Sequence, residues 1–129
     1  MKFGYTIVYV PDPAASLDFF ERAIGFERRF LHESGYGELA TGETTLAFAS
    51  HALGAGNLPA GYVRADASAQ PLGVEVAFVT EAVDDAYAKA LAAGAAPLKA
   101  PLDKPWGQRV AWVRCPDGTL VELCSPVAG

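Results

Sequence analysis

The second half of the chain ends in the stretch CPDGTLVEL, residues 115–123. Its Pro-Asp-Gly segment has the residue types of a three-residue hairpin loop, a type I turn followed by a glycine in the left-handed conformation. Such a loop sets Cys115 opposite Thr119, and the pairing then runs along both strands to set Trp112 opposite Glu122. The stretch therefore predicts a hairpin in which an indole and a carboxylate share one face of a sheet.

The length of this loop decides which side chains accompany Glu122. A two-residue loop would shift the register by one step and bring Val113, Ala111 and Arg109 to that face in place of Trp112. We favour the three-residue loop, and both Trp112 and Arg109 are candidate ligand-binding residues.

An internal repeat extends this organisation to the rest of the chain. In the first half a β-rich run at residues 6–10 precedes a helix predicted over 13–24, with Asp12 as its N-cap and proline at its first position. In the second half a run at residues 74–79 precedes an apolar helical pattern that starts at Val83. The order strand then helix thus occurs twice.

Two glycines give the spacing of the repeat. Gly25 and Gly94 end the two helices and lie 94 − 25 = 69 residues apart, whereas aligning Tyr5 with Glu75 gives 75 − 5 = 70. The two halves therefore differ in length by one residue over this span, and the match rests on pattern rather than identity.

Each predicted helix is followed by strand-and-turn material that completes a βαβββ unit. In the first half it covers residues 28–33, 36–40 and 44–50, and in the second half 96–99, 108–114 and 119–125. The segment between the units is rich in Gly, Ala and Pro. We therefore predict one domain over residues 1–129, with module one at 1–50, a linker at 51–71 and module two at 72–129.

The composition excludes several classes of protein. Of the 129 residues 51% are hydrophobic and 19% are charged, and no apolar run approaches the roughly 20 residues of a membrane span. A net charge of −5 with dispersed basic residues argues against a nucleic-acid partner. The N-terminus lacks a secretory signal pattern, and the two cysteines, Cys115 and Cys124, are expected to be free thiols. We expect a cytoplasmic protein without a membrane partner.

The repeat and two motifs together resemble the vicinal oxygen chelate superfamily, the glyoxalase/bleomycin-resistance/dioxygenase group. The terminal stretch is similar to the family's Asp-Pro-Asp-Gly-Asn segment with its following Glu and Leu, and it departs from that pattern at Cys115 and Thr119. The segment PWGQR at residues 105–109 is similar to one in bleomycin-resistance-like members. The resemblance implies an α+β fold, in which two paired βαβββ modules form a curled mixed sheet around a central cavity, and a homodimer.

The resemblance also implies where a metal would bind, on the first and fourth strands of each module. Those positions fall on Tyr5, Glu75 and Glu122, while the strand at residues 44–50 offers no carboxylate or imidazole. Tyrosine stays protonated near neutral pH and is a poor ligand, and a zinc or nickel site normally needs three or more protein ligands. We expect no bound cofactor, with a weakly held divalent metal as the alternative.

The two surviving carboxylates are the candidate catalytic residues if the protein is an enzyme. Glu75 lies in an apolar run, and Glu122 alternates with aliphatic neighbours, so both are predicted to face the cavity rather than solvent. Two carboxylates in one poorly solvated space repel, which raises the pKa of at least one and calls for a shared proton or a cationic partner. Such a pair suits general acid/base work and equally suits gripping a cationic ligand.

Aromatic side chains complete the predicted ligand-binding set. Tyr5 and Tyr9 alternate on one face of the first strand, and Phe48 is expected to join them from the fourth. Trp106, in the Pro-Trp-Gly loop, is either a stacking platform for a flat ligand or a loop anchor. His32 and His51 occupy no family ligand position and are expected at the surface or in the linker, although His51 has the alternative of contributing across a dimer.

These residues support two functional hypotheses. The first is a pocket protein with a mostly degraded metal site that binds or sequesters an organic, aromatic or cationic molecule. The alternative is a glyoxalase-like lyase or isomerase acting on a carbonyl or thiol-conjugate substrate through Glu75 or Glu122. A dioxygenase ranks below both, because its iron site needs two His and a carboxylate.

Overall fold

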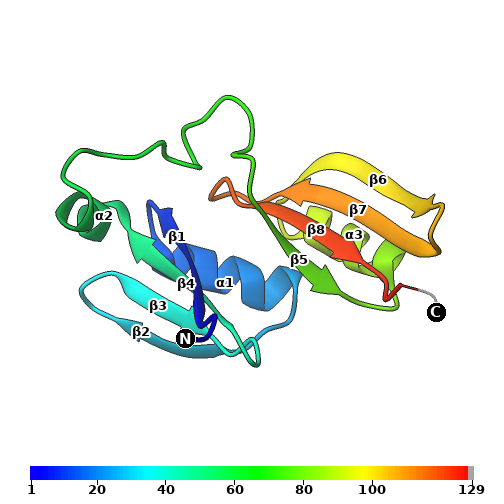
Figure 1. Ribbon diagram of the computed structural model, residues 1–129, viewed down its shortest axis with the longest axis horizontal. Coiled ribbons are helices and arrows are strands. Elements are labelled where there is room, and N and C mark those ends of the chain that lie inside the picture. The colour runs from blue at the N-terminus through cyan, green and yellow to red at the C-terminus, as the bar shows by residue number, and fades with distance from the viewer. Residues whose placement is uncertain (128–129) are drawn as a thin grey trace.

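The computed structural model describes residues 1–127 and contains two four-stranded sheets, each with one helix packed against it (Figure 1). The elements of the first half are β1 (Tyr5–Val10), α1 (Pro13–Ala23), β2 (Arg28–His32), β3 (Tyr36–Leu39) and β4 (Thr45–Ser50). A short helix, α2 (His51–Asn57), follows, and the second half holds β5 (Glu75–Val79), α3 (Val83–Ala92), β6 (Ala96–Lys104), β7 (Gln108–Arg114) and β8 (Leu120–Cys124).

The two halves repeat one topology. The strand order is β1-β4-β3-β2 in one sheet and β5-β8-β7-β6 in the other, with β1 parallel to β4 and β5 parallel to β8. The other neighbouring pairs are antiparallel. This is the predicted α+β class with two βαβββ modules, which is confirmed.

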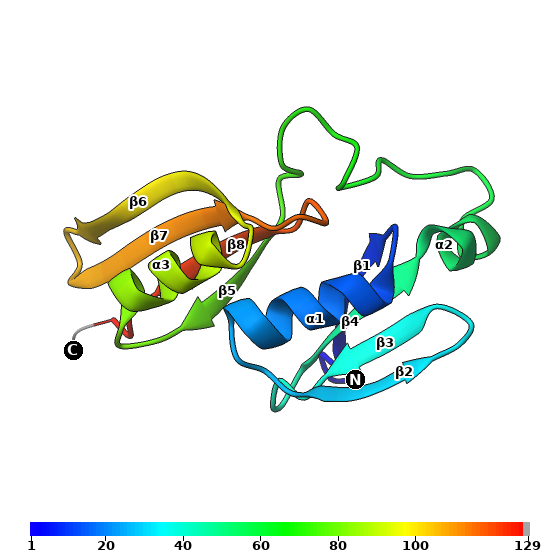
Figure 2. The same ribbon diagram turned by 180° about the vertical axis from the view of Figure 1, so that it is seen from behind.

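The sheets are open rather than closed into one cup. Figures 1 and 2 show α1 and α3 on the same side of the molecule, so the helix-free faces of both sheets point the other way, with β1 and β5 nearest one another at the centre. We call these helix-free surfaces the outer faces. In a single chain the two outer faces lie side by side and do not enclose a common cavity.

Local signals account for the main helix. Asp12 caps α1 by accepting a hydrogen bond from the Ala14 amide through its side chain, and Pro13 occupies the first helical position. Gly25 follows the helix with a φ of 95°. A left-handed residue at this position ends the helix at little cost only if it is glycine.

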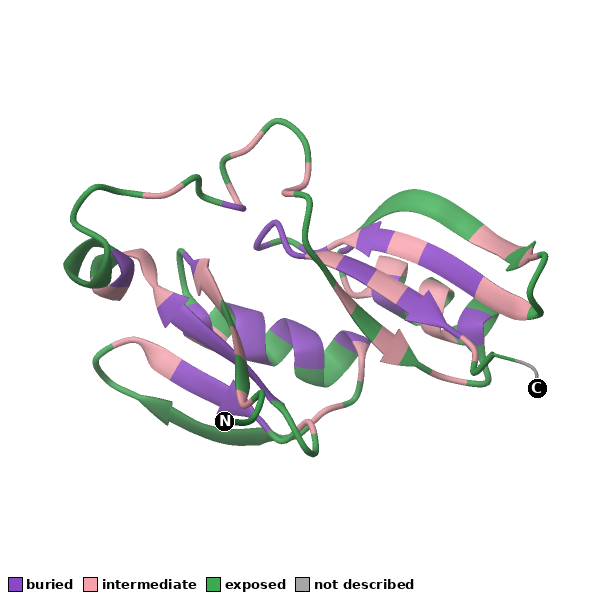
Figure 3. Ribbon diagram, viewed as in Figure 1, coloured by how far each residue is buried: buried purple, intermediate pink, exposed green. Residues whose placement is uncertain are grey.

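One hydrophobic core runs through both modules. Phe20 of α1 contacts Phe48 of its own module at a ring distance of 5.1 Å and Phe78 of module two at 6.2 Å. Buried residues of α1, the central strands and α3 belong to the same cluster, and Figure 3 shows much of the burial on α1 and the inner strands of both sheets. The modules are therefore coupled through a shared core.

Two segments differ from the sequence-based expectation. The predicted linker begins with α2, which Ser50 caps by accepting a hydrogen bond from the Leu53 amide. Strand β6, expected to end at residue 99, continues to Lys104 with two register shifts. It tolerates Pro97 and Pro101 because it is an edge strand, whose outward amides need no partner.

Candidate functional site

The outer face of module two is organised by the hairpin that closes the chain. The Cys115 amide donates to the Thr119 carbonyl at 2.9 Å, and the strands then pair with Trp112 opposite Glu122. Gly118 adopts a φ of 91°, as a three-residue loop requires. The predicted register is confirmed.

Glu75 and Glu122 come together on this face. Ala77 pairs with Glu122, and Glu75 lies two residues before Ala77, so both carboxylates project from the same side of neighbouring strands. The Trp112 indole Nε1 donates to Glu75 Oε2 at 3.2 Å. Burial raises the pKa of Glu122 above its ordinary value, hydrogen bonding and repulsion from Glu75 raise it further, and the Cys124 thiol and Lys104 partly offset these effects.

This pKa shift predicts that Glu122→Gln increases the stability of the fold in a pH-dependent way. The folded protein holds the Glu122 proton more tightly than the unfolded chain, so the carboxyl stabilises the fold below its ordinary pKa of about 4.3, and this contribution is lost as the pH rises through the folded value. The neutral amide avoids that loss. We expect thermal melts to show the variant gaining stability over wild type at neutral pH and losing this advantage below about pH 4. The exposed Glu43→Gln should show no such difference, and a parallel response of both variants would contradict the prediction.

A lysine lies between the two tryptophans of the chain. Lys104 Nζ is 5.7 Å from the Trp106 ring centroid and 5.5 Å from that of Trp112, within cation–π range. The Trp106 indole also donates to Gln108 Oε1 at 2.8 Å, yet the residue remains 56% exposed. The outer face of module two thus combines the indoles of Trp106 and Trp112, two carboxylates and the ammonium group of Lys104.

The outer face of module one carries exposed aromatic and aliphatic side chains. Tyr5 is 57% and Ile7 45% exposed, and both lie on the strand face predicted to line a cavity. Beside them Glu38 is buried, accepts a 2.7 Å hydrogen bond from the Tyr36 hydroxyl and lies 3.6 Å from an Arg29 nitrogen. Sequence reasoning missed Glu38, because it considered carboxylates only on the first and fourth strands.

Tyr9 lies further along the same strand and contacts the segment that connects the modules. Its ring stacks on Tyr62 at 4.8 Å, and its hydroxyl accepts from Asn57 Nδ2 at 3.2 Å. The structure therefore groups Glu75, Glu122, Trp106 and Trp112 on module two, whereas Tyr5 and Tyr9 lie on module one. The two groups do not meet within one chain.

The placement expected for Phe48 is wrong. Phe48 is fully buried against Phe20, because β4 pairs with β1 in a register that aligns Val8 with Phe48 and Ile7 with Ala47. The large residues of β4 therefore pack under α1, and its small residues form the outer face.

The alternative register, which placed Arg109 on the ligand face, is wrong. Its guanidinium bonds Asp84, at the start of α3, and Asp103 at 3.0 Å each, on the helix side of β7. These two carboxylates raise the pKa of Arg109. The three-residue loop requires this outcome, since it assigns the face of Glu122 to Trp112 and the opposite face to Arg109.

The histidines and Cys115 lie apart from this face, whereas Cys124 lies on it beside Glu122. His32 is exposed and bonds Ser34, and His51 begins α2. Cys115 and Cys124 are free and buried, and burial raises the pKa of both thiols. Raised pKa values favour the unreactive thiol form, which fits a structural role.

The donor set does not fit the metal of metal-dependent relatives. Within residues 1–127 no group of three or more His, Cys, Asp or Glu side chains is arranged to hold an ion. Ala47 occupies the β4 position that corresponds to Glu122, and Tyr5 occupies the position that corresponds to Glu75. A metal-free protein stays a prediction.

Two βαβββ modules in this order define a protein of the vicinal oxygen chelate type. The chain belongs to the Glyoxalase/Bleomycin resistance protein/Dioxygenase superfamily, whose family model matches residues 2–123.

Solved structures share this fold at low sequence identity. A glyoxalase/bleomycin resistance protein/dioxygenase family enzyme from Burkholderia phytofirmans PsJN is 22% identical, with a TM-score of 0.83 over 99% of this chain and 100% of its own. A glyoxalase-related enzyme from Fulvimarina pelagi is 19% identical, with a TM-score of 0.82 over 98% and 88%. A glyoxalase/bleomycin resistance protein/dioxygenase from Nocardioides is 21% identical, with a TM-score of 0.78 over 100% and 85%.

The search of curated proteins gives no match. Among residues 1–127 no helix has the length and apolar character needed to cross a membrane.

Proposed function

We propose that this protein binds a flat, cationic organic molecule on the outer face of module two. The observation that carries the proposal is the position of Lys104, whose ammonium group lies within cation–π distance of both Trp106 and Trp112. A planar cation that displaced Lys104 would stack on the same indoles, and Glu75 and Glu122 would supply the opposite charge. The raised pKa of Glu122 fits this role, because a bound cation would favour the ionised pair.

We further propose that a second copy of the chain completes this site. Each outer face exposes large apolar side chains, among them Tyr5, Ile7, Val79 and Trp106, which a monomer rarely leaves uncovered in quantity. In a twofold dimer the outer face of module one could cover that of module two in the partner, and the same contact would occur twice. Light scattering of the purified chain is expected to give the mass of a dimer.

The binding proposal predicts that Trp112→Ala greatly weakens capture of a planar cation. The probe is N-methylquinolinium, and quenching of tryptophan fluorescence is the readout, because the chain has two tryptophans and both lie on this face. Loss of one stacking surface and its cation–π contact should raise the Kd by about 10-fold or more. Glu122→Gln should weaken binding less, since Glu75 remains.

The controls distinguish binding at this site from non-specific binding. Arg109→Ala alters the opposite face of the same strand and should leave the Kd unchanged. Quinoline, which is neutral at pH 7.5, should bind more weakly than its N-methyl cation. Equal affinity for the two probes, or equal losses in the Trp112 and Arg109 variants, would rule the proposal out.

A second candidate function rests on the two neighbouring carboxylates, Glu75 and Glu122. Burial and Glu75 raise the pKa of Glu122, as expected of a general acid or base, and this favours a glyoxalase-like lyase or isomerase acting on a carbonyl or thiol-conjugate substrate. Proton NMR of the methylglyoxal–glutathione hemithioacetal would detect turnover. Turnover that Glu122→Gln abolishes, with the fold intact, would favour this alternative over simple binding.

The proposed cellular setting is the cytoplasm. The free, buried Cys115 and Cys124 suit a reducing compartment. A small molecule and a second copy of the chain are the proposed partners.

A further inference from the structure

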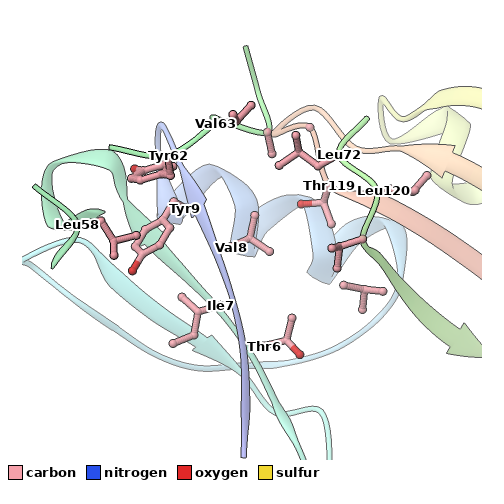
Figure 4. A pocket seen from close by; sticks show the side chains of 14 residues that line it. Thr6, Ile7, Val8, Tyr9, Leu58, Tyr62, Val63, Leu72, Thr119 and Leu120 are labelled. Atoms are coloured by element: carbon pink, nitrogen blue, oxygen red, sulfur yellow. The ribbon is translucent and has the colours of Figure 1, made fainter. Parts of the chain in front are cut away.

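A cavity of about 300 Å³ lies at the seam between the two modules, away from the indoles and carboxylates described above. Figure 4 shows it between β1, the segment after α2 and the loop before β8. Thr6, Tyr9, Leu58, Val63, Val74 and Thr119 are among the residues that line it, and we call it the seam cavity. This volume lies at the lower end of the range for small-molecule pockets, roughly 300–1,000 Å³.

The walls of the seam cavity favour an uncharged occupant. None of its lining side chains is acidic or basic, and most are aliphatic. The Tyr9 hydroxyl accepts from Asn57, and that of Tyr62 is hydrogen-bonded to His51, so each phenol oxygen already has one partner. A charged ligand would lose its hydration here without gaining a partner.

One buried polar group in the wall lacks a partner. Thr119 is only 5% exposed, and its Oγ1 makes no hydrogen bond with any of the described residues. In Figure 4 this hydroxyl points into the seam cavity. A buried hydroxyl without a partner is costly, so an unpaired group aimed into an apolar cavity marks the place where a ligand's polar atom would bind.

The segment after α2, residues 58–72, forms the roof of the cavity, and its central stretch is held in place before any ligand arrives. The Tyr62 hydroxyl bonds His51 Nδ1 at 2.7 Å, and His51 Nε2 lies 2.8 Å from Asp66 Oδ1. Arg114 donates to the carbonyls of Ala65 and Ser68. These bonds fix the stretch from Tyr62 to Ser68, which reduces the ordering that binding requires.

The roof also lies very close to the hairpin loop at Gly118. A Cβ added to Gly118 would lie 2.2 Å from the Ala65 carbonyl oxygen, so the connecting segment rests directly on the hairpin loop. The neighbouring Thr119 amide is held by Asp117 Oδ1 at 3.0 Å. The backbone that carries the unpaired hydroxyl is therefore fixed relative to the roof.

We infer that the seam cavity is a second ligand site, which takes a neutral cyclic molecule of about ten non-hydrogen atoms with one polar group that hydrogen-bonds Thr119 Oγ1. Indole and simple phenols have this size and chemistry. No residue of the proposed cation site lines the seam cavity, whereas Ile7 lines it and also belongs to the outer face proposed to meet a second copy.

The test compares indole with N-methylindole by ¹H–¹⁵N NMR titration of the full chain. Indole is expected to shift the amide signals of Gly118 and Thr119. Thr119→Val keeps the shape of the side chain and removes the hydroxyl, so it should weaken indole binding by about 3- to 10-fold, the worth of one hydrogen bond. N-methylindole cannot donate and should bind wild type and variant alike.

Matched controls keep the result interpretable. Thr119→Val should be at least as stable as wild type, because it loses no hydrogen bond. Thr45→Val, a buried threonine outside the seam cavity, should not change the affinity for indole. The inference is overturned by equal indole affinity in wild type and Thr119→Val, or by shifts confined to Trp106 and Trp112. It is also overturned if the Gly118 and Thr119 signals respond to protein concentration but not to indole, since a second copy then fills the cavity.

Discussion

Phe20→Ala is expected to lower the free energy of unfolding by about 3–5 kcal/mol, the usual cost of deleting a fully buried phenyl ring. Phe20 is completely buried, and its ring contacts Phe19, Phe48 and Phe78. Because Phe78 belongs to β5, the cavity left by the substitution would open at the junction of the two modules. Urea unfolding followed by circular dichroism measures the loss.

The same experiment tests whether the modules share a core. Phe30→Ala is the control, since that ring lies on β2 and is 43% exposed, so its loss should cost less than about 1 kcal/mol. One cooperative transition with a lowered midpoint is the expected result for Phe20→Ala. Two separate transitions in the wild-type protein, or similar losses in the two variants, would show that the core is not common to both modules.

The hairpin at the end of the chain shows what could be predicted from sequence. Turn residues have strong local preferences, and the length of the loop fixes the register of the strands that it joins. The pairing of Trp112 with Glu122, and hence the acidic and aromatic character of the outer face, followed from those preferences. The raised pKa of Glu122 followed in turn from its expected burial and its proximity to Glu75.

Phe48 shows where such reasoning stops. Every residue of β4 from Thr45 to Ala49 is buried, so the strand lacks the polar and apolar alternation that would reveal its faces. Its orientation depends on its parallel pairing with β1, and no local turn fixes that pairing. The alternation of large and small residues was the available signal, because the large side chains fill the space under α1.

Glu38 was missed for a related reason. It pairs with Ala47 across β3 and β4, as Trp112 pairs with Glu122 across β7 and β8. The two modules therefore both place a carboxylate on this pair of strands, but on opposite members of the pair. A search by family position finds only one of them, and the observed register was needed to relate the two.

The open arrangement of the two sheets could not be predicted from a single sequence. Strand patterns predict which faces are apolar, but they do not say whether the covering surface comes from the same chain or from another. Tyr5 and Ile7 have the alternation of a cavity-lining face and yet remain about half exposed in one chain. Their cover depends on association, which the pattern does not encode.

Asp117→Ala is expected to destabilise the protein by about 2–4 kcal/mol, because it removes two buried hydrogen bonds to one carboxylate. Asp117 Oδ2 accepts from the Ser16 hydroxyl at 2.6 Å, and Oδ1 accepts from the Thr119 amide at 3.0 Å. The first bond ties the hairpin loop of module two to α1 of module one, and the second holds the loop itself. Chemical unfolding at neutral pH measures the loss.

Two further variants show how much of this destabilisation comes from each of the two hydrogen bonds. Asp117→Asn retains an oxygen for the Thr119 amide and a nitrogen that can donate to Ser16, so it should cost less than about 1.5 kcal/mol. Ser16→Ala removes only the bond between the modules and should fall between the other two. If Asp117→Ala cost no more than Ser16→Ala, the bond to Thr119 would contribute nothing. The loop would then owe its conformation to Pro116 and Gly118, and the register that brings Trp112 to Glu122 would survive without the aspartate.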